Sequence, residues 1–103
     1  MRSTLKKFNG KTLRVKATFG GYKKNCRGEI SHVLLLNVME KNSQTYLTNH
    51  CHIHYNSELS TINLEIGDIL EFSATVCKYF NRYDTANHYH NFGLNAPKRF
   101  VRL

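Results

Sequence analysis

The stretch GDILEFSATVCKYF, from Gly67 to Phe80, decides the fold. Its first two residues are typical of a tight turn, and the residues that follow alternate with a period of two. One face carries the apolar side chains Leu70, Phe72, Ala74 and Val76. The other face carries Ile69, Glu71, Ser73, Thr75 and Cys77. This pattern predicts a strand with one face in a core and a more polar face exposed to solvent or to a ligand.

The same alternation predicts a first strand over residues 12–19, with inward and outward sets that separate cleanly. The inward set is Leu13, Val15, Ala17 and Phe19, and the outward set is Thr12, Arg14, Lys16 and Thr18. Gly20 and Gly21 then suit a bulge or a sharp bend, ahead of a loop that ends near Gly28. The apolar run HVLLLNVM predicts a second strand over residues 32–39. There we expect Leu34, Leu36 and Val38 to face the core, with Leu35 and Met39 beside Asn37.

The rest of the chain predicts two more strands and very little helix. A hairpin loop at residues 41–44 leads into a third strand over 45–55, with Leu47, Cys51 and Ile53 inward. Residues 56–66 leave room for one helical turn, capped by Ser57. After the strand that begins at Ile69, a polar loop at 81–91 precedes a last strand that Pro97 breaks. Residues 1–11 form a basic N-terminal arm with Leu5 and Phe8 as possible anchors, and residues 12–103 form a single domain.

Five short strands with a vestigial helix or turn between the third and fourth predict an all-β, five-stranded barrel. The connector at 56–66 and the long fourth strand resemble the OB-fold more than an SH3-like barrel. LTNHCHI, from Leu47 to Ile53, and GDILEFSATV also resemble nucleic-acid-binding OB domains, over about half of the chain. His52 departs from that resemblance, because an aromatic residue is more usual there. The arrangement is similar to small OB proteins of bacterial mobile elements that accompany replication enzymes.

The distribution of charge points to a polyanionic partner. Lys and Arg number 15 against 7 Asp and Glu, a formal charge of +8 with neutral histidines. Nine of the fifteen cations lie between Arg2 and Arg27, no acid precedes Glu29, and none follows Asp84. Nucleic acid is the first expectation and an anionic membrane the second. The alternative is that the charge serves only solubility.

The sequence gives no sign of membrane insertion or of secretion. Its longest aliphatic run, Val33 to Leu36, is far below the ~20 residues that a span needs. The basic first ten residues lack an apolar signal region. Three scattered cysteines, Cys26, Cys51 and Cys77, do not suggest a disulfide framework. We therefore expect a cytoplasmic protein with no membrane partner.

Two segments in which cationic and aromatic residues alternate, residues 22–27 and 78–92, predict the binding residues. Single-stranded nucleic acid is held by base stacking on aromatic rings and by cations along its phosphates. In an OB-fold the loops after the first and fourth strands flank the binding face, so these segments should meet in space. The predicted nucleic-acid-binding residues are Arg14, Lys16, Tyr22, Lys23, Lys24, Arg27, His52, Lys78, Tyr79, Arg82, Tyr83 and Tyr89. The alternative for some aromatics is closure of the barrel ends, which we assign to Phe72, Phe92 and Phe100.

Six histidines raise the possibility of a metal site, but their neighbours do not support one. His50, His52 and His54 share one strand face, and His88 and His90 repeat the spacing. The acids nearest to them in sequence are Glu58 and Asp84, so carboxylate support is thin. We expect a polar strand face and no metal or other cofactor.

Catalysis has no support either. The seven acids are scattered, and no nucleophile elbow or phosphate-binding loop is present, so we expect no enzyme and no small-molecule substrate. The first hypothesis is a non-catalytic module for single-stranded nucleic acid, DNA favoured over RNA, that is an accessory to replication or recombination. The second is a protein-interaction OB domain whose basic surface docks on a partner enzyme such as a polymerase or helicase.

Overall fold

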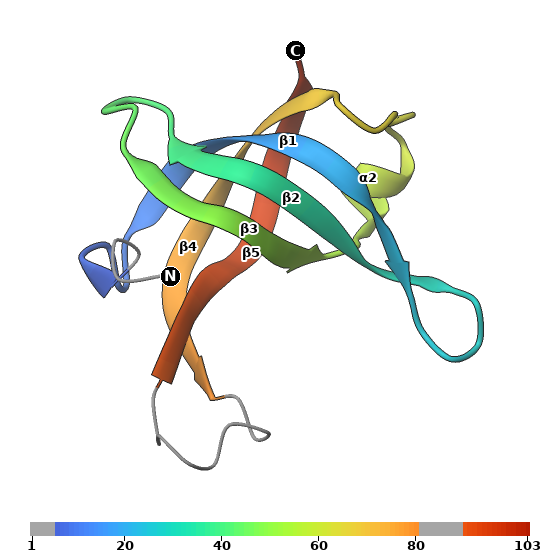
Figure 1. Ribbon diagram of the computed structural model, residues 1–103, viewed down its shortest axis with the longest axis horizontal. Coiled ribbons are helices and arrows are strands. Elements are labelled where there is room, and N and C mark those ends of the chain that lie inside the picture. Colours follow the sequence, from blue (N-terminus) through green and yellow to red (C-terminus); the bar gives the residue numbers. More distant parts are fainter. Residues whose placement is uncertain (1–5, 81–89) are drawn as a thin grey trace.

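The computed structural model describes residues 6–80 and 90–103, which form one antiparallel sheet with almost no helix. The hydrogen-bonded order is β3-β2-β1-β4-β5 (Figure 1). The elements are β1 (Thr12–Lys24), β2 (Ile30–Glu40), β3 (Tyr46–His54), the short helix α2 (Ser57–Ser60), β4 (Ile69–Phe80) and β5 (His90–Arg102). The predicted all-β class, with five strands and one helical turn between the third and fourth, is therefore confirmed. No helix within the described ranges is long and apolar enough to cross a membrane.

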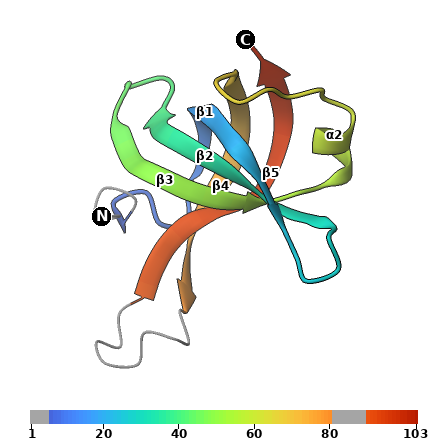
Figure 2. The same ribbon diagram turned by 45° about the vertical axis from the view of Figure 1, so that its right-hand side comes forward.

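The sheet coils strongly but does not close. β1, β2 and β3 form a layer that crosses over β4 and β5, and the core lies between the two (Figures 1 and 2). β3 and β5, the edges of the hydrogen-bonded order, approach each other without forming a ladder among the described residues. The predicted closed barrel is thus corrected to an open, coiled five-stranded sheet. The region where β3 and β5 approach is called the seam below.

The alternation in β4 and β1 predicts the core correctly. Leu70, Phe72, Ala74 and Val76 are fully buried, as are Val15, Ala17 and Phe19. The Phe72 ring stacks on Phe100 of β5 with 5.1 Å between ring centroids. Both rings belong to the core, in keeping with the structural role expected for them.

The predicted orientation of β2 is wrong on one side of Asn37. Val33, Leu35 and Val38 are buried, whereas Leu34 and Leu36 lie half-buried on the opposite face. The cause is a bulge: Lys16 pairs with Met39 but Thr18 pairs with Leu36, which leaves one extra residue in β2. Asn37 takes the left-handed conformation there, with φ of 51°. Because strand side chains alternate, one inserted residue reverses the face of everything before it.

The bulge predicted at the glycine pair of β1 is confirmed. Phe19 pairs with Leu35 and Gly21 with Leu34, so β1 carries an extra residue at Gly20. Gly21 has φ of 133°, which L side chains rarely adopt. A Cβ on Gly20 would lie 3.1 Å from Cγ of Leu36, so the leucine packs directly on the backbone. The strand continues past this bulge to Lys24 instead of ending at residue 19.

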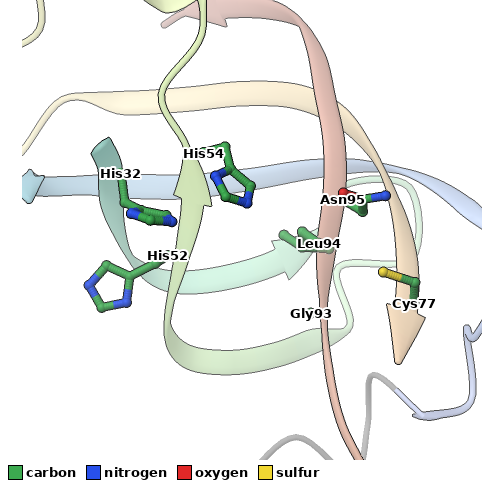
Figure 3. A pocket seen from close by; sticks show the side chains of 7 residues that line it. All are labelled: His32, His52, His54, Cys77, Gly93, Leu94 and Asn95. Atoms are coloured by element: carbon green, nitrogen blue, oxygen red, sulfur yellow. The ribbon is translucent and has the colours of Figure 1, made fainter. Parts of the chain in front are cut away.

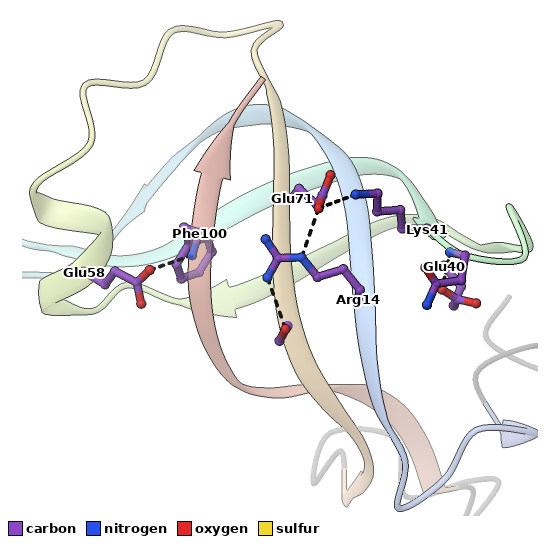
Figure 4. Close-up of polar contacts among 8 residues, drawn as sticks. Arg14, Glu40, Lys41, Glu58, Glu71 and Phe100 are labelled. Atoms are coloured by element: carbon purple, nitrogen blue, oxygen red, sulfur yellow. Dashed lines mark hydrogen bonds and ion pairs between the residues drawn. The ribbon is translucent and has the colours of Figure 1, made fainter.

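Helix α2 is fixed to β5 by its cap and by one carboxylate. The cap is Asn56 and not the predicted Ser57: Asn56 Oδ1 accepts a 3.0 Å bond from Leu59 N–H. Asn56 Nδ2 donates to the Pro97 carbonyl at 3.0 Å. The Glu58 carboxylate accepts the N–H group of Arg99 at 3.0 Å and that of Phe100, and Figure 4 shows the second of these bonds. These bonds hold the β3–β4 connection against β5.

Pro97 does not break the last strand. β5 runs from His90 to Arg102 and carries bulges on both sides of the proline. Ala96 and Arg99 take left-handed conformations, with φ of 50° and 57°. A proline is tolerated in a strand at a bulge because no ladder hydrogen bond is required of it there.

Candidate functional site

The candidate site is the surface of β1, β2 and β3 that points away from the core, called the outer face below. Strand register brings its residues into four rows across the three strands. The rows are Lys16–Met39–Tyr46, Thr18–Leu36–His50, Gly21–Leu34–His52 and Lys23–His32–His54. Both bulges are needed to form these rows, since they turn Leu34 and Leu36 outward and leave bare backbone at the glycines.

The outer face is cationic, and no carboxylate occurs in its four rows. Lys16 and Lys23 are exposed at its two ends. The acid that borders it is Glu71 of β4, which pairs with Lys16 in the β1–β4 ladder. Glu71 Oε1 accepts from Arg14 Nε at 3.1 Å and from Lys41 Nζ at 2.8 Å (Figure 4). These hydrogen bonds, from Lys41 and then Arg14, hold the pKa of Glu71 below its usual value.

Three other described acids are likewise engaged within the protein. Glu40 accepts the backbone N–H groups of Asn42 and Ser43, which keep its pKa low. Asp68 accepts from Glu65 N–H at 2.9 Å and lies 3.9 Å from Arg102. Glu58 is bonded to β5, as described above. Glu40 and Glu71 line a pocket with Lys16 and Met39, and Glu29 is exposed on the β1–β2 hairpin, so the described carboxylates near the outer face lie at its two ends.

A hairpin extends the cationic surface beyond the sheet. The hairpin of residues 22–30 consists of the end of β1, the connection 25–29 and the start of β2, and it projects at the lower right of Figures 1 and 2, away from the paired ends of β4 and β5 at the lower left. Lys23, Lys24 and Arg27 are all exposed on this hairpin. Asn25 Oδ1 accepts from Arg27 N–H at 2.9 Å and from Glu29 N–H at 3.1 Å, which closes the turn. The hairpin thus presents three exposed cations and one exposed carboxylate, Glu29.

Two of the predicted binding residues are engaged within the protein. Tyr22 is 37% exposed, and its ring lies edge-on against Phe19 at 4.9 Å and Tyr55 at 5.8 Å. This burial raises the pKa of its hydroxyl. Arg14 is committed to Glu71 and also donates to Ser73 Oγ at 3.1 Å. Tyr22 therefore offers a partial ring surface, and Arg14 offers a charge that is already neutralised.

Several predicted residues fall where the structure gives no side-chain description. Lys78 and Tyr79 belong to β4, where they pair with Phe92 and Asn91. Their side chains, and the whole of Arg82, Tyr83 and Tyr89, lie outside the described residues. The predicted meeting of the two basic-aromatic segments stays a prediction.

A groove of about 330 Å³ lies at the seam, with three histidines of β2 and β3 on one side and residues of β4 and β5 on the other (Figure 3). It is lined by His32, His52, His54, Cys77, Gly93, Leu94 and Asn95. The rings of His32 and His54 lie 4.6 Å apart, and those of His32 and His52 lie 6.4 Å apart. Burial, with the neighbouring His54 and Lys23, lowers the pKa of His32.

Of this cluster, the sequence singled out His52 alone as a binding residue. The sequence signal that could have identified His54 is its position on the same strand face as His50 and His52. His32 could not be found without the β2–β3 register that places it opposite His54.

Within residues 6–80 and 90–103, no group of three or more histidine, cysteine or acidic residues is arranged to hold a metal ion. Comparison of the chain with protein-family models, with curated proteins and with solved structures gave no match. Its function is therefore inferred from its own residues.

Proposed function

We propose that this chain is a non-catalytic module that binds single-stranded nucleic acid, with DNA as the preferred form. The observation that carries the proposal is the outer face together with its hairpin. They present four exposed cations, Lys16, Lys23, Lys24 and Arg27, against one exposed carboxylate, that of Glu29 in the hairpin. Such a surface attracts a phosphate backbone and gains affinity by releasing its counterions.

The apolar and aromatic residues of the same face favour a single strand over a duplex. Half-buried Leu34 and Leu36 lie in the two rows between Lys16 and Lys23, and the exposed Tyr46 lies on β3 in the same row as Lys16. Unpaired bases can lie against such side chains, whereas duplex bases are stacked on each other. Base contacts to aromatic rings are worth roughly 1–3 kcal/mol each.

The topology supports an OB-type domain. A coiled antiparallel sheet with a short helix between β3 and β4 is what that fold requires, apart from a β3–β5 ladder. OB-folds bind oligonucleotides on strands 2 and 3 and on the loops that flank them. The role proposed for the module is that of an accessory to DNA replication or recombination, which binds the strand on which other proteins act.

Fluorescence anisotropy tests this function. An oligo-dT of about 15 nucleotides, within reach of one or two OB-type sites, is compared with a duplex of equal length over a salt series. We expect tighter binding of the single strand and a log–log salt slope of about −3 if all four cations contact phosphates. Equal affinity for both forms would show that charge alone is responsible.

A matched pair of variants locates the site. Lys23→Gln removes a cation from the outer face, and Lys98→Gln removes one from exposed β5. Only the first should weaken binding and reduce the slope, by about 0.7. Failure to bind either nucleic acid would instead point to an acidic protein partner for the basic surface.

A further inference from the structure

The seam groove places imidazoles where a phosphate of the bound strand would pass. It opens beside the outer face, since His32 and His54 form a row with Lys23 of the hairpin. No carboxylate lines the groove within the described residues. The described titratable groups that line it are His32 from β2, His52 and His54 from β3, and Cys77 from β4. Lys23 of β1 is not part of the lining, but it is paired with His32 in the sheet and its charge acts on that ring. From β5 come Gly93, Leu94 and Asn95, which do not titrate.

Hydrogen bonding fixes which nitrogen of His32 can take up a proton. Ser31 Oγ donates to the Lys23 carbonyl at 3.2 Å, so its proton is committed. The Nδ1 of His32, 2.9 Å from that oxygen, must then be the donor. In this tautomer Nε2 is the basic nitrogen, and protonation converts it from an acceptor into a donor.

The surroundings of His32 disfavour its protonated form when the groove is empty. Burial is the main cause, and the charges of His54, whose ring lies 4.6 Å away, and of Lys23 add to it, so that the pKa of His32 is lowered. An anion in the groove reverses that balance, because it favours the protonated ring. Proton uptake and anion binding therefore strengthen each other.

We propose that the seam groove is an acid-dependent phosphate subsite, in which protonated His32 and His54 join Lys23 in binding one backbone phosphate of a single-stranded nucleic acid. This inference rests on the proposed function and adds a regulation to it: affinity rises as the pH falls through the histidine range. The ligand chemistry is a phosphodiester monoanion, and its charge does not change over that range.

The size of the effect follows from the exposure of the site. An exposed ion pair strengthens binding about 1.4- to 5-fold. Two imidazolium contacts therefore predict roughly fivefold tighter binding of oligo-dT at about pH 5.5 than at about pH 7.5. The salt slope should also steepen by about 0.7 if protonation adds one phosphate contact.

The test measures oligo-dT affinity by anisotropy at the two pH values and at constant ionic strength. We compare the wild-type chain with two variants. One carries both His32→Gln and His54→Gln. The other, His50→Gln, is the control, because His50 lies outside the groove on the same face of β3. We expect the ratio of affinities to fall to about one in the double variant and to persist in His50→Gln. Thermal melting checks that each variant is folded, and the single variant His54→Gln replaces the double one if that fails to fold.

A wild-type chain that binds oligo-dT equally at both pH values, or a double variant that keeps the acid enhancement, overturns the subsite. Dimethyl phosphate supplies a second arm that does not depend on nucleic-acid binding. Its addition at low pH should shift the imidazole C–H NMR signals of His32 and His54. If oligo-dT does not bind at all, the proposed function fails, and this titration decides the subsite alone: shifted signals support it and unshifted signals refute it.

Discussion

Asn37 offers a stability test of the strand register on which the outer face depends. Its φ of 51° lies in the left-handed region, which costs most residues roughly 1–2 kcal/mol and costs Asn less. Asn37→Val should therefore destabilise the fold by about 1–2 kcal/mol. We expect a cost in the upper part of this range because valine is branched at Cβ. For a domain of about 100 residues, this lowers the melting temperature by about 4–16 °C. Asn37→Gly should stay within about 0.5 kcal/mol of wild type, because glycine adopts this conformation at little cost.

Urea unfolding followed by circular dichroism measures these differences, and Asn49→Val is the matched control. Asn49 is an exposed residue of β3 outside the positive-φ set, so valine there should be neutral or slightly stabilising. If Asn37→Val were as stable as Asn49→Val, the bulge would not exist in solution. Simple alternation would then turn Leu34 and Leu36 into the core, and the outer face would lose its apolar rows.

Three further predictions address the core, the buried carboxylate and the hairpin. Phe72→Ala should cost roughly 3–5 kcal/mol in urea unfolding, because it leaves a cavity against Phe100; a loss below about 1 kcal/mol would contradict its burial. The depressed pKa of Glu71 means that its stabilising effect is present above its unfolded pKa of about 4.3 and is lost as the pH falls through its folded value. Melting curves should therefore show Glu71→Gln less stable than wild type near neutral pH and the gap narrowing toward about pH 3, whereas a constant gap would refute the pairing. Lys24→Gln should weaken oligo-dT binding and lower the salt slope by about 0.7 without changing the melting temperature. An unchanged slope would mean that the bound oligonucleotide does not contact the hairpin.

The sequence predicts those parts of the fold in which one pattern persists without interruption. In β4 every alternate residue from Leu70 to Val76 is buried, so period-two alternation was sufficient. In β2 the pattern failed because Asn37 inserts a bulge, and the run HVLLLNVM is apolar on both faces. The prediction that Pro97 breaks the last strand was wrong for a related reason, because bulges at Ala96 and Arg99 let β5 continue past the proline. Bulges depend on pairing with a neighbouring strand, which a single segment does not specify.

The sequence predicts correctly those site residues whose availability depends only on their being exposed. Lys23, Lys24 and Arg27 follow a glycine pair in a hairpin and are exposed as expected. Arg14 looked equally available, but Glu71, 57 residues away in sequence, takes its charge. The opposition of His32 and His54 likewise arises from the β2–β3 register. Long-range pairing decides both cases, and composition carries no information about it.

Amide NMR mapping of oligo-dT binding to the intact chain tests the central claim most directly. The account predicts that the largest shift changes fall on the outer face and the hairpin, at residues such as Lys16, Lys23 and His52. Lys98 and Arg99 of β5 should change little. Changes concentrated on β5 away from the seam, or a spectrum that saturating oligo-dT leaves unaltered, would contradict it.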